Sequence, residues 1–155
     1  MIHIEIPGRD DLRIEHILLD YNGTIAVDGA LAPGVADSIK ALAQQAHVAV
    51  LTADTYGSVH AQCDPLQVEV VTFPRAGAAA FKQEYARGLE GQIACIGNGF
   101  NDVGMLDQAD LAIAILDGEG AYAGLIAHAD VLARSANEGL ELLLKPDRLR
   151  ATLRT

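Results

Sequence analysis

Five short apolar runs, separated by stretches with helical spacing, constrain the fold of this chain more than any other feature of its sequence. They cover residues 16–20, 48–51, 68–72, 93–96 and 111–115. Each run is rich in Ile, Val or Leu without strict alternation, as is typical of parallel strands that are buried on both faces of a sheet. Their alternation with helical segments predicts right-handed crossovers and a doubly wound α/β sheet with helices on both faces.

The helical segments carry apolar side chains three or four residues apart. These are Val35, Ile39, Leu42 and Ala46 within residues 34–46, and Phe81, Tyr85 and Leu89 within residues 76–89. Near the C-terminus a short predicted helix stops at Pro146, and one or two helical turns follow it. At the N-terminus, isoleucines alternate with polar residues over 2–6, turn residues follow, and apolar spacing returns over 12–15, which predicts an edge hairpin.

Length and charge narrow the classes of function. A chain of 155 residues is expected to fold as one domain, residues 1–155, with a core large enough to need no disulfides. The formal net charge of −10 argues against nucleic acid or an anionic membrane as a partner. Cys63 and Cys95 lie far apart without a zinc-site spacing, and Cys95 is expected to be a buried strand residue. With no visible secretory signal and no membrane-length apolar segment, a cytoplasmic location is expected.

Polar residues follow the apolar runs at places where chemistry is expected. Ligands of doubly wound sheets bind at the carboxyl ends of the strands, so these residues are candidates for one site. They are Asp20, with Asn22 and Thr24 behind it; Thr52, with Ala53 and Asp54; Lys82, the only lysine between Lys40 and Lys145; and Asn98, Asn101 and Asp102 in the stretch "CIGNGFND".

The order of these motifs resembles the haloacid dehalogenase superfamily, whose signature is DxDGT, an apolar run ending in Thr or Ser, a Lys, and an acidic GDxxxD-type element. Within that superfamily the chain looks closest to the phosphorylation domain of P-type ATPases. Its "TAD" resembles their TGD, and "GNGFNDVGMLDQADLAIAI" resembles their GDGxNDxxAL element. The resemblance runs from about Leu18 to Leu132, and the agreement of all four motifs in order makes it specific.

The resemblance implies a Mg²⁺-dependent phosphohydrolase or phosphotransferase that acts on a phosphorylated substrate or ATP. Asp20 would be the nucleophile that forms an aspartyl phosphate, as the transfer of a highly charged group requires. The phosphoryl oxygens would be bound by Thr52, the backbone N–H of Ala53, Lys82 and Asn101. Mg²⁺, which prefers oxygen ligands, would be held by Asp20, the backbone carbonyl of Asn22, Asn98 and Asp102.

Two amides depart from the family pattern. Asn22 stands where the family has the acid that protonates the leaving oxygen and activates water, a role typically worth 10²- to 10⁴-fold in rate. P-type ATPases also lack this acid and use ATP, whose leaving group needs little protonation. Asn98 stands where the fourth motif has its first acid, so metal affinity should fall. A slow enzyme that favours good leaving groups and accumulates its intermediate is expected.

Other interpretations of the same residues remain open. Asp20 and Asp102 are also suited to helix or turn capping, Thr52 and Asp54 to N-capping of the helical segment that follows them, and Lys82 to a solvated helix face. A regulatory protein could sense nucleotide, Mg²⁺ or phosphate in this pocket without turnover. A receiver-type phosphoacceptor is disfavoured, because its acceptor follows a later strand. The five histidines show no paired spacing typical of metal ligands and are expected to be structural or exposed.

The spacing of the motifs leaves no room for a cap domain. Each interval, from Asp20 to Thr52 and from Thr52 to Lys82, is filled by one helix and one strand. An open site of this kind favours a macromolecular substrate, a protein partner that supplies a lid, or a homo-oligomer whose neighbour closes the site.

Overall fold

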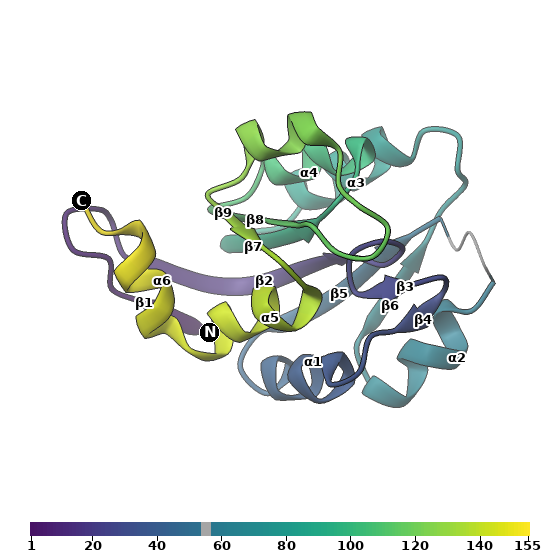
Figure 1. Cartoon of the computed structure of the whole chain (residues 1–155), viewed down its shortest axis with the longest axis horizontal. Coiled ribbons are helices and arrows are strands. Elements are labelled where there is room, and N and C mark those ends of the chain that lie inside the picture. The colour runs from purple at the N-terminus through teal and green to yellow at the C-terminus, as the bar shows by residue number, and fades with distance from the viewer. Residues whose placement is uncertain (54–56) are drawn as a thin grey trace.

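The computed structural model describes residues 1–53 and 57–155 and is built around a seven-stranded sheet. Its strands are β1 (Ile2–Ile4), β2 (Leu12–Asp20), β5 (His47–Thr52), β6 (Glu69–Thr72), β7 (Gln92–Gly97), β8 (Leu111–Ile115) and β9 (Val131–Ala133). The order β6-β5-β2-β7-β8-β9 is parallel throughout, and β1 pairs antiparallel with the start of β2 (Figure 1). This topology confirms the predicted doubly wound sheet.

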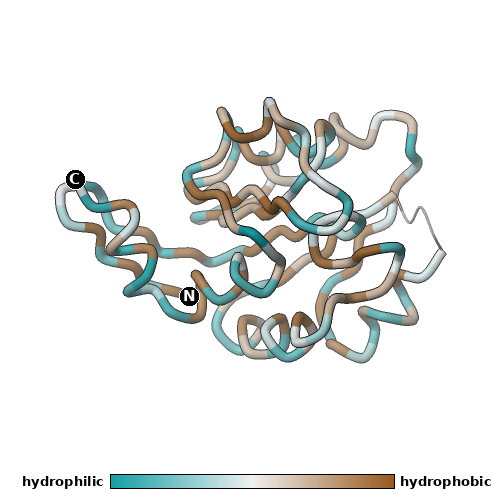
Figure 2. The backbone as a smooth tube through the Cα atoms, viewed as in Figure 1, coloured by the Kyte–Doolittle hydropathy of each residue, from teal (hydrophilic) through white to brown (hydrophobic). Residues whose placement is uncertain are grey.

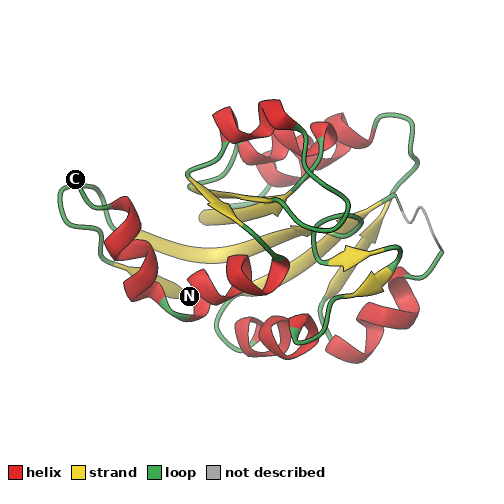
Figure 3. Cartoon of the chain, viewed as in Figure 1, coloured by secondary structure: helices red, strands yellow, loops and turns green. Residues whose placement is uncertain are grey.

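Helices cover both faces of the sheet (Figure 3). They are α1 (Val35–Ala43), α2 (Val59–Cys63), α3 (Ala78–Arg87), α4 (Val103–Leu106), α5 (Ala136–Leu144) and α6 (Pro146–Leu153), with 3-10 turns η1 (Asp64–Leu66), η2 (Phe100–Asp102) and η3 (Ala123–His128). Helices α3 and α4 lie on one face, and α1 and α5 lie on the other. The three-layer arrangement agrees with the sequence-based expectation. Every helix within the described residues is too short or too polar to span a bilayer.

Each face of the sheet has its own hydrophobic core. Alternate residues of β2 supply the two cores: Ile17 and Leu19 face α1 and α5, whereas Leu18 faces α3 and α4. Figure 2 shows the apolar colour concentrated along the central strands. Cys95 is fully buried in β7, as predicted.

Three sequence-based details differ from the structure. Residues 12–15 and 16–20, predicted as a hairpin arm and a separate core strand, form the single strand β2. Strand β6 is not buried on both faces, because it lies at the edge of the sheet. In α3 the buried side chains are Ala78, Lys82 and Ala86, whereas Phe81 is 38% exposed. The apolar spacing of this helix was misleading, since the small residues lie nearest the sheet.

No cap domain is inserted between β2 and α1. The connection holds only a two-stranded ribbon, β3 (Ala26–Val27) and β4 (Ala30–Leu31), which no pattern in the sequence indicated. The strand β9 was also missed, because three residues are too few for a clear pattern. Within residues 1–53 and 57–155, no separate domain covers the carboxyl ends of the central strands.

Candidate active site

The carboxyl ends of β2, β5 and β7 bring the predicted site together. Parallel pairing aligns Asp20 with Leu51 of β5, and Leu19 with Ile96 of β7. Asp20, Thr52 and Gly97 are thus the last residues of three adjacent strands. Asp20 and Thr52 are both buried, at 6% and 2% exposed. A polar group at this depth must find partners within the protein.

Lys82 supplies the central partner. Its side chain is 1% exposed, and its ammonium donates hydrogen bonds to one carboxylate oxygen each of Asp20 and Asp102, the second at 2.6 Å. Helix α3 delivers this lysine across the face of the sheet because small residues on either side of it, Ala78 and Ala86, allow a close approach. The structure therefore excludes the interpretation of Lys82 as a solvated surface lysine.

Burial makes the three charges strongly interdependent. Burial, followed by the charge of Asp102, raises the pKa of Asp20 from 3.8 to a net value of about 6, although Lys82 and Thr24 act to lower it. Burial also disfavours the charged form of Lys82, but Asp20 and Asp102 outweigh this effect and raise its pKa above its ordinary value. At neutral pH the group thus consists of two carboxylates and one ammonium, with a net charge of −1.

Thr24 links the first and fourth motifs. Its hydroxyl lies 2.7 Å from Asp20 Oδ2 and 3.1 Å from Asn98 Oδ1. The intervening turn requires Gly23, which has φ +78°, and a Cβ there would lie 2.3 Å from the Asn98 side chain. The sequence placed Thr24 at this strand end but indicated no catalytic, phosphate-binding or metal-binding role for it, since its contact with Asn98 is non-local.

Asp102 is held in one orientation by the turn that follows β7. Its Oδ2 accepts hydrogen bonds from the backbone N–H groups of Asn98 and Gly99, at 3.0 and 2.9 Å, while Oδ1 accepts from Lys82. A Cβ at Gly97 would lie 2.6 Å from the Asp102 carboxyl carbon. Asp102 therefore both caps the turn and belongs to the charged group, so the two predicted interpretations are compatible.

Asn98 is also fixed at both ends of its amide. Its Nδ2 donates to the backbone oxygen of Gly120 at 3.0 Å, and its Oδ1 lies 3.1 Å from the Thr24 hydroxyl, whose single proton it shares with Asp20 Oδ2. Its backbone oxygen accepts from the N–H of Tyr122 at 2.8 Å. The loop around Gly120 and Tyr122 had no recognisable signal in the sequence, because its role depends on a contact more than twenty residues away.

The remaining predicted residues lie near this group. Asn22 Nδ2 lies 3.5 Å from Thr52 Oγ1, while Asn22 Oδ1 is buried and has no hydrogen-bond partner among the described residues. Ala53 is half-buried directly after β5, and Asn101 is half-buried in η2, next to Asp102. Asp54 lies outside the described residues.

The donor set fits a weakly held, hard divalent cation. Asp20, Asn98 and Asp102 supply oxygen atoms, and the unpartnered oxygen of Asn22 shows that acceptor capacity exceeds the available donors. Only two of these groups carry charge, and both already contact Lys82. The described residues contain no cluster of three or more His, Cys, Asp or Glu that could hold a metal. Mg²⁺, which keeps several waters, suits such a site better than a cation that needs a full protein cage.

Solved structures share this fold. A 3-deoxy-D-manno-octulosonate 8-phosphate phosphatase from Moraxella catarrhalis, in complex with magnesium ion, phosphate ion and a KDO molecule, is 18% identical, with a TM-score of 0.70 over 91% of this chain and 94% of its own. The cobalt-bound phosphatase of the same substrate from Haemophilus influenzae is 13% identical, with a TM-score of 0.70 over 92% of this chain and 94% of its own. A third structure is a candidate hydrolase of the HAD (haloacid dehalogenase) superfamily, subfamily III A, from Legionella pneumophila. It is 17% identical, with a TM-score of 0.65 over 90% of this chain and 87% of its own.

Sequence comparison finds two relatives in Methanocaldococcus jannaschii. The uncharacterized protein MJ0073 is 43% identical over 63 residues, which are 41% of this chain and 68% of that protein. The uncharacterized protein MJ0072 is 49% identical over 39 residues, 25% of this chain and 89% of that protein. No protein-family model matches the chain. The chain therefore has the capless fold of the haloacid dehalogenase superfamily and belongs to the same family as MJ0073.

Proposed function

We propose that this protein is a Mg²⁺-dependent phosphohydrolase or phosphotransferase that acts through an aspartyl phosphate on Asp20. The observation that carries the proposal is the buried group of Asp20, Lys82 and Asp102 at the carboxyl ends of parallel strands. The phosphate-bound and metal-bound phosphatases of the same fold support the reaction class.

Asp20 has the chemistry of a nucleophile for phosphorus. With a pKa of about 6 it is mostly ionised at neutral pH, yet it is more basic than an ordinary aspartate. One of its oxygens attacks phosphorus, and the leaving oxygen departs in line. Lys82 and the Thr52 hydroxyl stabilise the charge on the phosphoryl oxygens. Bound Mg²⁺, held by Asp20, Asn98, Asp102 and the Asn22 carbonyl, would supply further charge neutralisation.

Asn22 limits the reaction because an amide cannot transfer a proton. Its side chain lies beside Thr52, close to the predicted phosphate position, but it provides neither a proton for the leaving oxygen nor a base for water. Acyl phosphates, aryl phosphates and ATP have leaving groups that need little protonation. We therefore infer slow turnover, a preference for such donors, and accumulation of phospho-Asp20.

A phospho-adduct assay tests the nucleophile. Incubation with acetyl phosphate, ATP or p-nitrophenyl phosphate and Mg²⁺ should give an acid-stable, hydroxylamine-labile adduct, and peptide mass spectrometry should assign it to Asp20. The Asp20→Asn variant should not label. Equal labelling of Asp20→Asn and the wild type would show that another residue is the nucleophile.

The Asn22→Asp variant tests the missing acid. Turnover of alkyl phosphates should rise by about 10²-fold or more, whereas turnover of acetyl phosphate should change little, because its leaving group needs no proton. Steady-state assays with both donors measure the difference. Equal gains with both donors, or no gain with the alkyl phosphate, would contradict the role assigned to Asn22.

A regulatory protein that senses phosphate or nucleotide is the second candidate. The contacts of Asp20 and Asp102 with Lys82 favour this candidate, because within the described residues both carboxylates of the site are already paired with an ammonium. Calorimetric binding of ATP or phosphate without an adduct from any donor would select this function. The open site also suits a partner or second copy that supplies a lid.

A further inference from the structure

A pair of histidines lies at the opposite end of the sheet from the candidate active site. His16 of β2 and His47 of β5 are partners in the parallel register. Their Nδ1 atoms are 3.4 Å apart, and their rings are inclined at 74° with centroids 5.5 Å apart. The 31-residue separation hid this pair in the sequence, where the histidines showed no metal-ligand spacing.

The other nitrogen of each ring has an acceptor as its partner. His16 Nε2 lies 2.9 Å from the backbone oxygen of Glu90, which can only accept a hydrogen bond. His47 Nε2 lies 2.9 Å from a carboxylate oxygen of Glu69. Each Nε2 must therefore carry a hydrogen. Glu69 is itself anchored, because the Tyr85 hydroxyl bonds to it; burial and this bond raise the pKa of Tyr85 to about 12.

These partners determine whether the two facing Nδ1 atoms carry a hydrogen. In a neutral imidazole with a hydrogen on Nε2, Nδ1 carries only a lone pair. When both rings are neutral, two lone pairs face each other across 3.4 Å. A cation between them removes the repulsion. Zn–N bonds of 2.0–2.1 Å in tetrahedral geometry place two ligand nitrogens about 3.3 Å apart, close to the observed separation.

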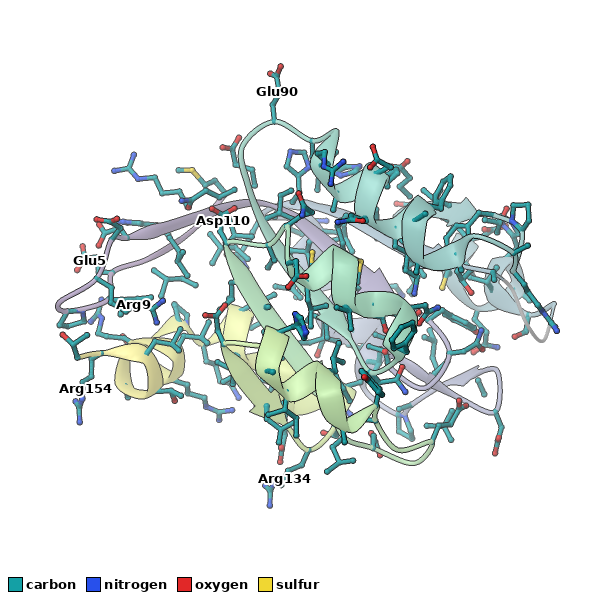
Figure 4. The ribbon with its side chains drawn as sticks, turned by 90° about the horizontal axis from the view of Figure 1, so that it is seen from above. Glu5, Arg9, Glu90, Asp110, Arg134 and Arg154 are labelled. Atoms are coloured by element: carbon teal, nitrogen blue, oxygen red, sulfur yellow. The ribbon has the colours of Figure 1, made fainter. Side chains whose placement is uncertain are left out.

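We propose that His16 and His47 bind one divalent transition-metal ion, such as Zn²⁺, through their Nδ1 atoms. Hydrogen bonds from metal-binding histidines to a carboxylate or backbone oxygen are the usual means of fixing the ligand nitrogen, and Glu69 and Glu90 provide both kinds here. Water completes the coordination, because a surface hollow of about 440 Å³ adjoins His47. Figure 4 shows the Glu90 side chain pointing away from the molecule at the tip of its loop.

This site differs from the candidate active site in both position and chemistry. His16 and Asp20 lie on the same face of β2, four residues or about 13 Å apart. Imidazole nitrogens favour Zn²⁺, Ni²⁺ or Cu²⁺, whereas the oxygen donors around Asp20 suit Mg²⁺. Excess Mg²⁺ should therefore leave the histidine pair available.

Zinc calorimetry on matched variants tests the proposal. In excess Mg²⁺, the wild type and His60→Gln should bind the same number of Zn²⁺ ions. His60 is a suitable control because it is exposed and pairs with Asp64, as His3 does with Asp11 and His128 with Asp107. His16→Gln and His47→Gln should each lose one equivalent, and Glu69→Ala should weaken that equivalent about 10- to 100-fold.

Two further measurements keep the test decisive. Asp20→Asn should retain the equivalent, which separates this site from the proposed catalytic one. Urea unfolding without metal identifies any variant that is simply misfolded, and the Zn²⁺-induced rise in stability should occur in the wild type but not in His47→Gln. Equal zinc stoichiometry in the wild type and His47→Gln, or no zinc binding by the wild type, would overturn the proposal.

Discussion

Three charged side chains with a net charge of −1 are buried together at the carboxyl ends of the central strands. The pKa of Asp20 is raised from 3.8 to about 6, mainly by burial. Between these two values the folded protein holds a proton that the unfolded chain releases, so stability falls as pH rises through this window. Above about pH 6 the full cost is present, about 3 kcal/mol for a shift of roughly two units.

Removing this charge should stabilise the protein. Asp20→Asn should raise the free energy of unfolding by about 1–3 kcal/mol at neutral pH, and by little at about pH 4, where Asp20 is protonated in the wild type. Urea unfolding at both pH values, in buffer with a chelator, measures the difference. A gain that is the same at both values would mean that the charge of Asp20 is not its cause.

At Asn98, unlike at Asn22, we expect replacement by the aspartate of the family pattern to disturb a hydrogen bond. Asn98 Nδ2 donates to the Gly120 oxygen, so Asn98→Asp would place a carboxylate against a carbonyl. We expect a loss of about 1–3 kcal/mol in unfolding free energy and no gain in turnover. Asn22→Asp is the matched variant, because it acts on the other departure. A stable, faster Asn98→Asp enzyme would contradict this interpretation.

The sequence was sufficient to name Asp20, Thr52, Lys82 and Asp102, because they occur in the order of the family's motifs and Lys82 is the only lysine between Lys40 and Lys145. Their proximity in the fold agrees with that prediction, while their chemical roles remain predictions. Contacts such as those from Thr24 to Asn98 and from His16 to His47 were not predictable. They depend on strand register and loop packing, which leave no local pattern.

At the scale of elements, local capping is as informative as apolar spacing. Helix α5 begins after Ser135, whose hydroxyl accepts a hydrogen bond from the backbone N–H of Glu138 at 3.2 Å. Helix α3, in contrast, begins after Gly77 without a side-chain cap. The apolar spacing located both helices, but it indicated the wrong buried face for α3, where Lys82 and two alanines are buried and Phe81 is partly exposed.

The cap of α5 is testable by a pair of substitutions. Ser135→Ala should cost about 1 kcal/mol of unfolding free energy, since the N–H of Glu138 loses its acceptor. Ser135→Asp should restore most of this loss, because its carboxylate can accept the same bond and favours a helix N-terminus. Chemical denaturation of all three proteins measures the effect. Equal losses in both variants would show that the hydroxyl acts through some other contact.

At the scale of the whole molecule, the two ends of the chain stabilise each other. Helix α6 packs against the β1–β2 hairpin, where Arg150 Nε donates to the Glu5 oxygen at 3.0 Å and Thr155 N–H donates to the Pro7 oxygen at 3.2 Å. Figure 4 shows Glu5, Arg9 and Arg154 at this same end. The alternating isoleucines predicted the hairpin, but its cover by the last helix joins residues about 145 positions apart.

Leu149 tests whether this distant end belongs to the same cooperative unit as the site. It is fully buried and belongs to the hydrophobic core that also contains Ile17 and Leu19 of β2, the strand that ends in Asp20. Leu149→Ala should therefore cost about 2–5 kcal/mol, whereas Leu132→Ala, at a side chain 45% exposed, should cost far less. If the loss of stability extends along β2 to Asp20, two measurements should show unfolding at the same urea concentration. These are the loss of the circular dichroism signal and the loss of phospho-adduct formation. Separate transitions would mean that the hairpin and α6 unfold independently of the strand ends that carry the chemistry.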